Sequence, residues 1–179
     1  LTKGAVLLCT TGIIIHLRSR EKMFYFAPLT QREDKDDWLG YGRFEYQRID
    51  KCFMITGSES GYLFSKCLTW TDYKMSLDFK ILTRCLGVIV RAVNLSNYAM
   101  LQIEHNGIRP HIRINGGWAI WEPKDVSLEF ASTLSLDQWY RLYVTCDKDV
   151  VNIVLMENGG SILFERKWVI PRGWTKFLL

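Results

Sequence analysis

Apolar and polar residues alternate with a period of two along most of the chain beyond residue 37, which predicts short β-strands. The pattern is clearest in residues 73–81. One side of this predicted strand is apolar (Tyr73, Met75, Leu77, Phe79, Ile81) and the other is polar (Lys74, Ser76, Asp78, Lys80). Similar runs occur at 43–49, 52–56, 62–66, 139–146, 150–156 and 161–167. About ten short strands without a long amphipathic helix indicate an all-β antiparallel sandwich or barrel, and polar outer sides favour the sandwich.

The segment from 86 to 118 is predicted to form three successive strands joined by two turns. One turn lies at 94–97 and the other at Asn106-Gly107, a strong hairpin signal. Polar residues recur at alternate positions of these strands: Arg91, Gln102, Glu104, Arg109, His111 and Arg113. The intervening positions are apolar, among them Val88, Val90, Leu101, Ile103 and Ile112. We therefore expect the apolar side in the core and the polar side outside.

Two interpretations of this polar side stay open. Together with Asp78, its donors and acceptors suit sugar hydroxyls or another polar ligand, with Tyr98 or Trp118 stacking on a ring. Alternatively, it is an ordinary solvated face with surface ion pairs, each worth about 0–1 kcal/mol. Trp118 and Trp121 follow in a Gly-bounded loop and are predicted either to anchor a ligand or partner, or to cover the edge of the core.

Composition excludes several classes of protein. The 179 residues suffice for one domain with a core, and 48% hydrophobic residues argue against disorder. A net charge of +4 without a basic stripe gives no indication of nucleic-acid binding. The five scattered cysteines have no metal-ligand spacing, so no metal site is predicted, and no motif indicates a cofactor. Reduced thiols favour the cytoplasm or the cytoplasmic face of a membrane; an exported domain with one or two disulfides is the alternative.

The first 37 residues are predicted to be distinct from a β-domain at 38–179. Residues 4–17 are apolar except for His16, and residues 31–37 (QREDKDD) form a charged linker. As a helix, the 14 residues 4–17 would span about 21 Å, less than the roughly 30 Å of a bilayer core. This run is therefore expected to form buried strands or a buried helix, or else the end of a membrane anchor. Leu1 in place of Met leaves open that the chain is a fragment.

Several of these runs resemble the concanavalin A-like lectin/glucanase superfamily, and within it laminin-G-like and 3-keto-disaccharide hydrolase-like domains. The similar stretches are 73–80 (YKMSLDFK), 87–92 (GVIVRA), 97–103 (NYAMLQI) and 136–142 (LDQWYRL), followed by 150–155 and Asn158-Gly159. The resemblance covers roughly residues 41–167. It implies a jelly roll of two curved antiparallel sheets, with ligands on the concave sheet or its rim loops. The strand order of the family also implies that Asp78 lies on a strand next to the polar side of residues 86–118. The paired-carboxylate E-x-D-x-x-E strand of the glucanase members and a closing G-x-x-G-F-R strand are missing.

We therefore expect a non-catalytic recognition module, part of a larger protein, that binds carbohydrate or a protein partner. Its predicted ligand-binding residues are Arg91, Tyr98, Gln102, Glu104, His111, Arg113, Trp118 and Trp121. One alternative is a glycoside-processing hydrolase of the 3-keto-disaccharide hydrolase-like kind. Its candidate catalytic residues are Asp78 and Glu104, as a carboxylate pair, and His111, as a general base. The other alternative is a structural or assembly domain whose tryptophans are buried against another chain.

Overall fold

The computed structural model describes residues 5–8, 13–17, 24–27, 29, 31–65, 72–119 and 128–175. These residues form mostly β structure, with one 3-10 helix, η1 (Arg32–Asp37), and one short α-helix, α1 (Arg172–Thr175). All strand pairs are antiparallel. The prediction of an all-β antiparallel fold is therefore confirmed at this level.

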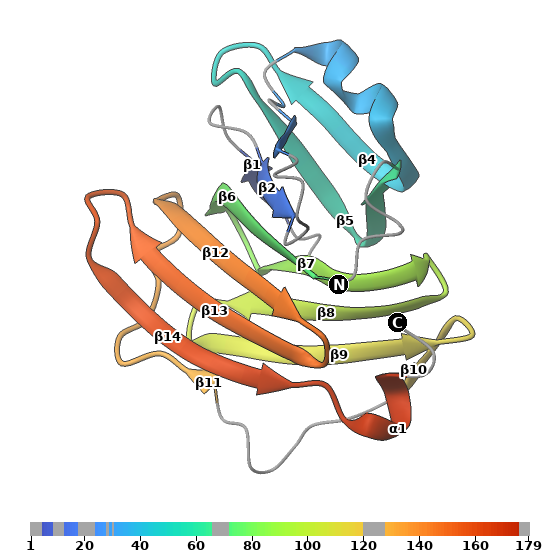
Figure 1. Ribbon diagram of the computed structural model, residues 1–179. Helices are drawn as coiled ribbons and strands as arrows, with labels where there is room; N and C mark the ends of the chain where they lie inside the picture. The colour runs from blue at the N-terminus through green and yellow to red at the C-terminus, as the bar shows by residue number, and fades with distance from the viewer. Residues whose placement is uncertain are drawn as a thin grey trace.

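The strands form two sheets (Figure 1). The nine-stranded sheet runs in the order β14 (Ile162–Val169), β13 (Val150–Glu157), β12 (Trp139–Asp147), β6 (Tyr73–Ile81), β1 (Ala5–Leu8), β5 (Cys52–Phe64) and β4 (Trp38–Gln47). Off this path, β2 (Ile13–Leu17) pairs with β3 (Phe24–Ala27) and with β6. The five-stranded sheet runs in the order β10 (Gly117–Ala119), β9 (Gly107–Ile114), β8 (Asn97–Glu104) and β7 (Cys85–Asn94), with β11 (Leu128–Glu129) also on β9.

The two sheets share one hydrophobic core. Figure 1 shows β6, β12, β13 and β14 in one layer and β7, β8 and β9 in the other. Alternate side chains of both layers point inward and are almost fully buried, including Phe79, Leu142 and Ile153 of the first and Leu101, Ile103 and Ile112 of the second. Burying a side chain of this size contributes about 1.5–3 kcal/mol, so this alternation stabilises the pairing of the layers.

The strands β1 and β2 both lie within the N-terminal apolar run. β1 pairs with β5 and with residues 79–81 of β6, whereas β2 pairs with residues 73–76 of the same strand. In the part of the chain that the structure describes, no helix has the length and apolar character needed to cross a membrane.

A long hairpin of β4 and β5 extends the nine-stranded sheet beyond β1 (Figure 1). The sequence predicted separate short strands at 52–56 and 62–66, but β5 is one strand from Cys52 to Phe64. Ring contacts hold the hairpin together: the Phe44 ring lies 4.4 Å from Phe53 and 4.8 Å from Tyr62, between centroids. The charged segment 31–37 before it, predicted as a linker, includes η1, which has no buried residue.

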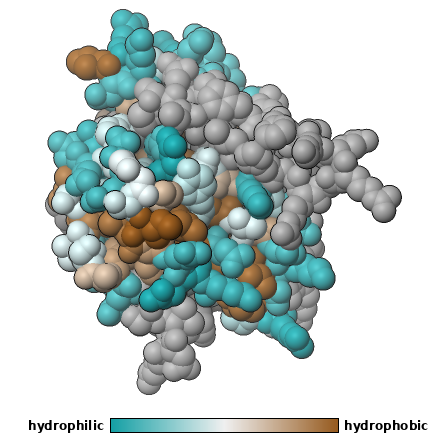
Figure 2. Space-filling model, turned by 60° about the vertical axis from the view of Figure 1, so that its left-hand side comes forward, coloured by the Kyte–Doolittle hydropathy of each residue, from teal (hydrophilic) through white to brown (hydrophobic). Residues whose placement is uncertain are grey.

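The described surface is largely hydrophilic in the view of Figure 2, with hydrophobic side chains gathered in a few small areas. Large apolar side chains that are more than one-third exposed include Leu39, Tyr41, Val93, Trp118, Leu136, Tyr143 and Ile162. Single exposed apolar residues are normal on a protein surface. They indicate a candidate binding site only where they lie beside suitable polar side chains.

Candidate ligand-binding face on the five-stranded sheet

Most of the predicted ligand-binding residues lie together on the outer face of the five-stranded sheet. The register of β8 and β9 places Tyr98 opposite Arg113, Met100 opposite His111 and Gln102 opposite Arg109. The residues between them, such as Leu101 and Ile112, are buried in the core. The polar-out, apolar-in alternation thus gathers six predicted residues on one surface: Tyr98, Gln102, Glu104, His111, Arg113 and Trp118.

One end of this face is aromatic and cationic. Trp118 pairs with Arg113 across the β9–β10 ladder, and its side chain is 48% exposed. The Arg113 guanidinium carbon lies 5.6 Å from the Trp118 ring centroid and 5.9 Å from that of Tyr98. His111 packs edge-on against Trp118, with 5.5 Å between ring centroids. Tyr98 is buried, so the indole of Trp118 is the ring that a ligand can reach.

Hydrogen bonds fix the direction of the Arg113 side chain. Its Nε donates to the carbonyl oxygen of Gly116 at 2.9 Å, and its Nη1 donates to the Tyr41 hydroxyl of β4 at 3.3 Å. Hydrogen bonds to Tyr41 and then to Tyr98 raise the pKa of Arg113 above its usual value, so the guanidinium stays charged. A fixed cation beside an exposed indole loses little conformational entropy when a ligand binds.

The other end of the face is polar and contains the glutamate. Gln102 Nε2 donates to Glu104 Oε1 at 2.7 Å, and Arg109 Nε lies 3.6 Å from Glu104 Oε2. The Glu104 side chain is 22% exposed and that of Arg109 is 56% exposed. Each carboxylate oxygen of Glu104 therefore has a neighbouring side chain that orients it, so Glu104 is positioned to accept hydrogen bonds from a ligand.

Between the two ends the face is apolar. Met100 lies over Gly87 of β7, where an added Cβ would come within 2.5 Å of the Met100 sulfur. Ile89, also of β7, lies opposite Met100 in the ladder between β7 and β8. The face thus presents an indole and a cation at one end, an apolar middle, and an amide with a carboxylate at the other end.

Arg91 does not belong to this face, and its predicted position is wrong. The ladder between β7 and β8 has a bulge: Ile89 pairs with Met100, but Arg91 already pairs with Ala99. Val90 is the inserted residue, so the alternation is reversed beyond it and Arg91 turns inward. Its side chain is 1% exposed.

The buried guanidinium of Arg91 joins the two sheets. Its Nη2 donates to the carbonyl oxygen of Lys148, in the turn between β12 and β13, and lies 3.5 Å from Asp72 Oδ1. Tyr73 is close by, with its ring centroid 5.9 Å from the guanidinium carbon. Arg91 therefore has a structural role between the layers, and a surface ligand cannot reach it.

The predicted pairing of Asp78 with Glu104 is also wrong, because the two residues belong to different sheets. Asp78 lies on β6 and Glu104 on β8, and both point to the outside of their own sheet. Glu104 and His111 do share a face, but their positions are about four residues apart along the strands, or about 13 Å. Glycosidase carboxyl groups are about 5–9.5 Å apart on one site, so Asp78 and Glu104, which lie on the outer faces of different sheets, do not form such a pair.

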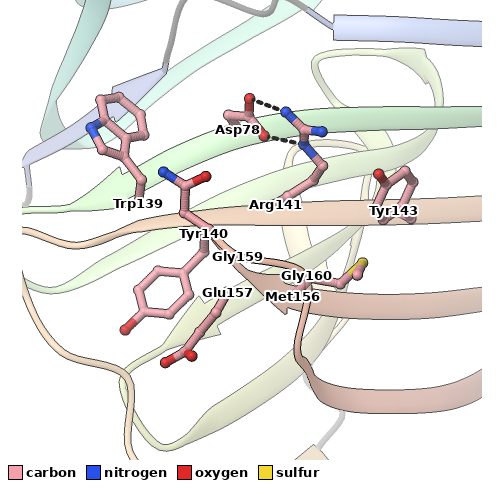
Figure 3. A pocket seen from close by; sticks show the side chains of 10 residues that line it. Asp78, Trp139, Tyr140, Arg141, Tyr143, Met156, Glu157, Gly159 and Gly160 are labelled. Atoms are coloured by element: carbon pink, nitrogen blue, oxygen red, sulfur yellow. Dashed lines mark hydrogen bonds and ion pairs between the residues drawn. The ribbon is translucent and has the colours of Figure 1, made fainter.

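Asp78 instead lines a separate pocket of about 380 Å³ on the nine-stranded sheet (Figure 3). Sequence reasoning missed its other residues, which come from β12, β13 and the turn after β13: Trp139, Tyr140, Arg141, Tyr143, Met156, Glu157, Asn158, Gly159 and Gly160. The alternation of Trp139, Arg141 and Tyr143 along β12 was the available signal.

Trp121, the remaining predicted ligand-binding residue, lies outside the described residues. No group of three or more His, Cys, Asp and Glu side chains within the described ranges is arranged to hold a metal ion. Searches with family models, against curated proteins and against solved structures found no significant match to this chain.

Proposed function

We propose that this protein is a non-catalytic recognition module that binds carbohydrate along the outer face of the five-stranded sheet. The observation that supports this most is the exposed indole of Trp118 beside the fixed guanidinium of Arg113. A pyranose ring has an apolar C–H face and a rim of hydroxyl groups. An indole can cover the first while charged and amide groups bind the second.

The remaining parts of the face fit an extended saccharide. Gln102 and Glu104 offer an amide and a carboxylate at the end opposite Trp118. The apolar stretch over Met100 and Gly87 between them would accept the C–H groups of a second ring. Two antiparallel sheets around one core also support the further proposal that the fold is a jelly roll of the kind that the resemblance implies.

A protein partner is the second candidate for the same end of the face. Tyr41 and Trp118 are 45% and 48% exposed, and both contact Arg113. Tyrosine, tryptophan and arginine are the residues that most often dominate binding energy at protein interfaces. The hydrolase alternative has no comparable support, because Asp78, Glu104 and His111 do not assemble into a catalytic pair.

A glycan array followed by calorimetric titration tests the carbohydrate proposal. Trp118→Ala and Gln102→Ala should each weaken binding of the best glycan by about tenfold or more. Leu136→Ala and Glu165→Ala serve as matched controls, since they remove an exposed apolar and an exposed polar side chain elsewhere on the surface. Unchanged affinity in both face variants would overturn the assignment. Glycan inactivity, together with a protein captured by the wild type and lost in Trp118→Ala, would favour the second candidate.

A further inference from the structure

The pocket on the nine-stranded sheet has a charged floor and two aromatic sides. Arg141 binds Asp78 with two hydrogen bonds, Nε to Oδ1 at 2.5 Å and Nη2 to Oδ2 at 2.8 Å. Figure 3 shows this pair between Trp139 and Tyr143, whereas Tyr140 and Glu157 point away from it. The volume of about 380 Å³ lies within the range of about 300–1,000 Å³ that is typical of small-molecule sites.

The strand β12 positions all three of the side chains that define this pocket. Trp139, Arg141 and Tyr143 occupy alternate positions, so they point to the same outer face, and the two rings are about 13 Å apart along the strand. Arg141 pairs with Asp78 of β6 on one side and with Met156 of β13 on the other. Three neighbouring strands therefore hold the floor of the pocket, and it needs no loop closure to form.

Arg141 retains donors for a ligand. A guanidinium has five N–H donors, of which two bind Asp78 and one contributes to a hydrogen bond with Tyr143. The Arg141 side chain is 42% exposed and that of Asp78 is 15% exposed, so the arginine presents its outer edge to the pocket. The hydrogen bonds to Asp78 raise the pKa of Arg141 above its usual value, so the guanidinium stays charged.

The charges around the pocket favour a neutral ligand over an anion. Arg141 is neutralised by Asp78, and Lys80, whose Nζ lies 5.3 Å from the Trp139 ring centroid, is neutralised by Asp137 at 2.7 Å. Glu157 adds a further negative charge to the lining. A neutral ligand with several hydroxyl groups fits this set, because it can accept hydrogen bonds from Arg141 and donate them to Asp78.

We propose that this pocket binds one neutral pyranose ring, with its hydroxyl edge on the Asp78–Arg141 pair and its C–H face on Tyr143. Tyr143 is 39% exposed and provides an accessible ring on the same face as the ion pair. The ring is either a free monosaccharide or the terminal residue of a glycan. This site lies on a different sheet from Trp118 and does not depend on the function proposed for that face.

Titration of the full chain with neutral methyl pyranosides (glucoside, galactoside and mannoside), followed by NMR of the Met156 methyl group, tests the proposal. At least one of them should shift this signal in a saturable manner, and methyl glucuronide should bind more weakly. Tyr143→Ala and Arg141→Lys should each weaken binding about tenfold. Tyr143→Phe keeps the ring and should retain most of the wild-type affinity. Glu165→Gln, on the edge strand β14, is the matched control and should agree with the wild type within about twofold.

The outcomes separate the two sites and the two sources of the ring. Stronger binding of a disaccharide than of its terminal methyl pyranoside identifies a glycan end; equal binding identifies a free monosaccharide. The pocket proposal is overturned if no neutral pyranoside shifts Met156, or if folded Tyr143→Ala and Arg141→Lys bind like the wild type. Shifts confined to Trp118 also overturn it and leave the sheet-face proposal standing. Shifts at Met156 without any at Trp118 support the pocket, and the glycan array then decides on the sheet face separately.

Discussion

Arg91 of β7 donates a hydrogen bond to the carbonyl oxygen of Lys148, so a side chain of one sheet holds a turn of the other. The same turn is bound a second time, because the Lys148 backbone N–H donates to Asp72 Oδ1 at 2.7 Å. Asp72 in turn lies 3.5 Å from Arg91 Nη2. Each of these three residues therefore contacts the other two, and together they link the two sheets where β6, β7 and the β12–β13 turn meet.

Replacing Arg91 by alanine should lower the free energy of unfolding by about 2–4 kcal/mol. The substitution leaves a cavity between the sheets and removes the donor that satisfies the Lys148 carbonyl. Urea denaturation measures this loss. Arg109→Ala removes an exposed arginine, and its effect should stay within about 0.5 kcal/mol. Equal losses in the two variants would contradict a structural role for Arg91.

Lys148→Gly should leave stability unchanged or raise it by up to about 1 kcal/mol. Lys148 acts through its backbone atoms and has a φ of 53°, a left-handed conformation that glycine adopts without strain. Asp72→Ala removes the acceptor of the Lys148 N–H and should destabilise by about 1 kcal/mol. The same denaturation experiment compares the two variants. A loss above 1 kcal/mol in Lys148→Gly would show that its side chain matters.

The stability of the protein should fall between pH 9 and pH 11 partly because of Cys146. Burial raises the pKa of this thiol from 9.0 to about 11, and its Sγ lies 3.5 Å from the Val90 carbonyl oxygen. In this interval the unfolded chain has already released the proton that the folded chain retains, so rising pH favours unfolding. The contribution is present below pH 9 and is lost towards pH 11, by up to about 2–3 kcal/mol.

Denaturation of wild type and Cys146→Ala at pH 7 and pH 10 isolates this effect. Cys146→Ala is expected to be less stable at pH 7, because it removes a buried side chain, but its stability should decline less with pH. The difference between the two proteins in how the free energy of unfolding changes with pH is the contribution of the Cys146 thiol. Parallel pH dependence in the two proteins would contradict the assignment.

Tyr41→Phe should weaken glycan binding at the five-stranded sheet by about twofold to fivefold, and Arg113→Ala by about tenfold or more. The Tyr41 hydroxyl accepts a hydrogen bond from Arg113 Nη1, so its loss frees the guanidinium without removing it. Calorimetric titration with the glycan selected on the array gives both affinities. Tyr62→Phe is the matched control, since its hydroxyl bonds to the Gly42 carbonyl. A loss in Tyr62→Phe equal to that in Tyr41→Phe would indicate a general effect of the hairpin.

The strands of the core could be predicted from the sequence because their alternation is regular. Residues 73–81 and 150–156 show it, and the structure has β6 and β13 at these places. The outward direction of Gln102, Glu104, His111 and Arg113 also follows from alternation. The period of two fixes which side chains share a face of one strand, and for β8 and β9 this was sufficient.

Two predictions, the direction of Arg91 and the position of Asp78, are wrong because the alternation of residues does not contain the information that they need. The Val90 bulge shifts the pattern by one residue and turns Arg91 into the core, and no Gly or Pro marks this place in the sequence. The resemblance implies that Asp78 lies on a strand next to that of Glu104, but β6 pairs with β12 and lies in the other sheet. Pairing between distant strands depends on the whole core, so local patterns do not reveal it.

The outer surfaces of the two sheets face away from each other, because their inner surfaces share the core. If Trp118 and the Asp78–Arg141 pocket both bind sugars, a single copy of the chain is bivalent and can bridge two glycans on opposite sides. Such a molecule would cross-link branched or surface-bound glycans and hold them more firmly than either contact alone. Turbidity with a multivalent glycoprotein would then appear for the wild type and vanish when either surface is disabled.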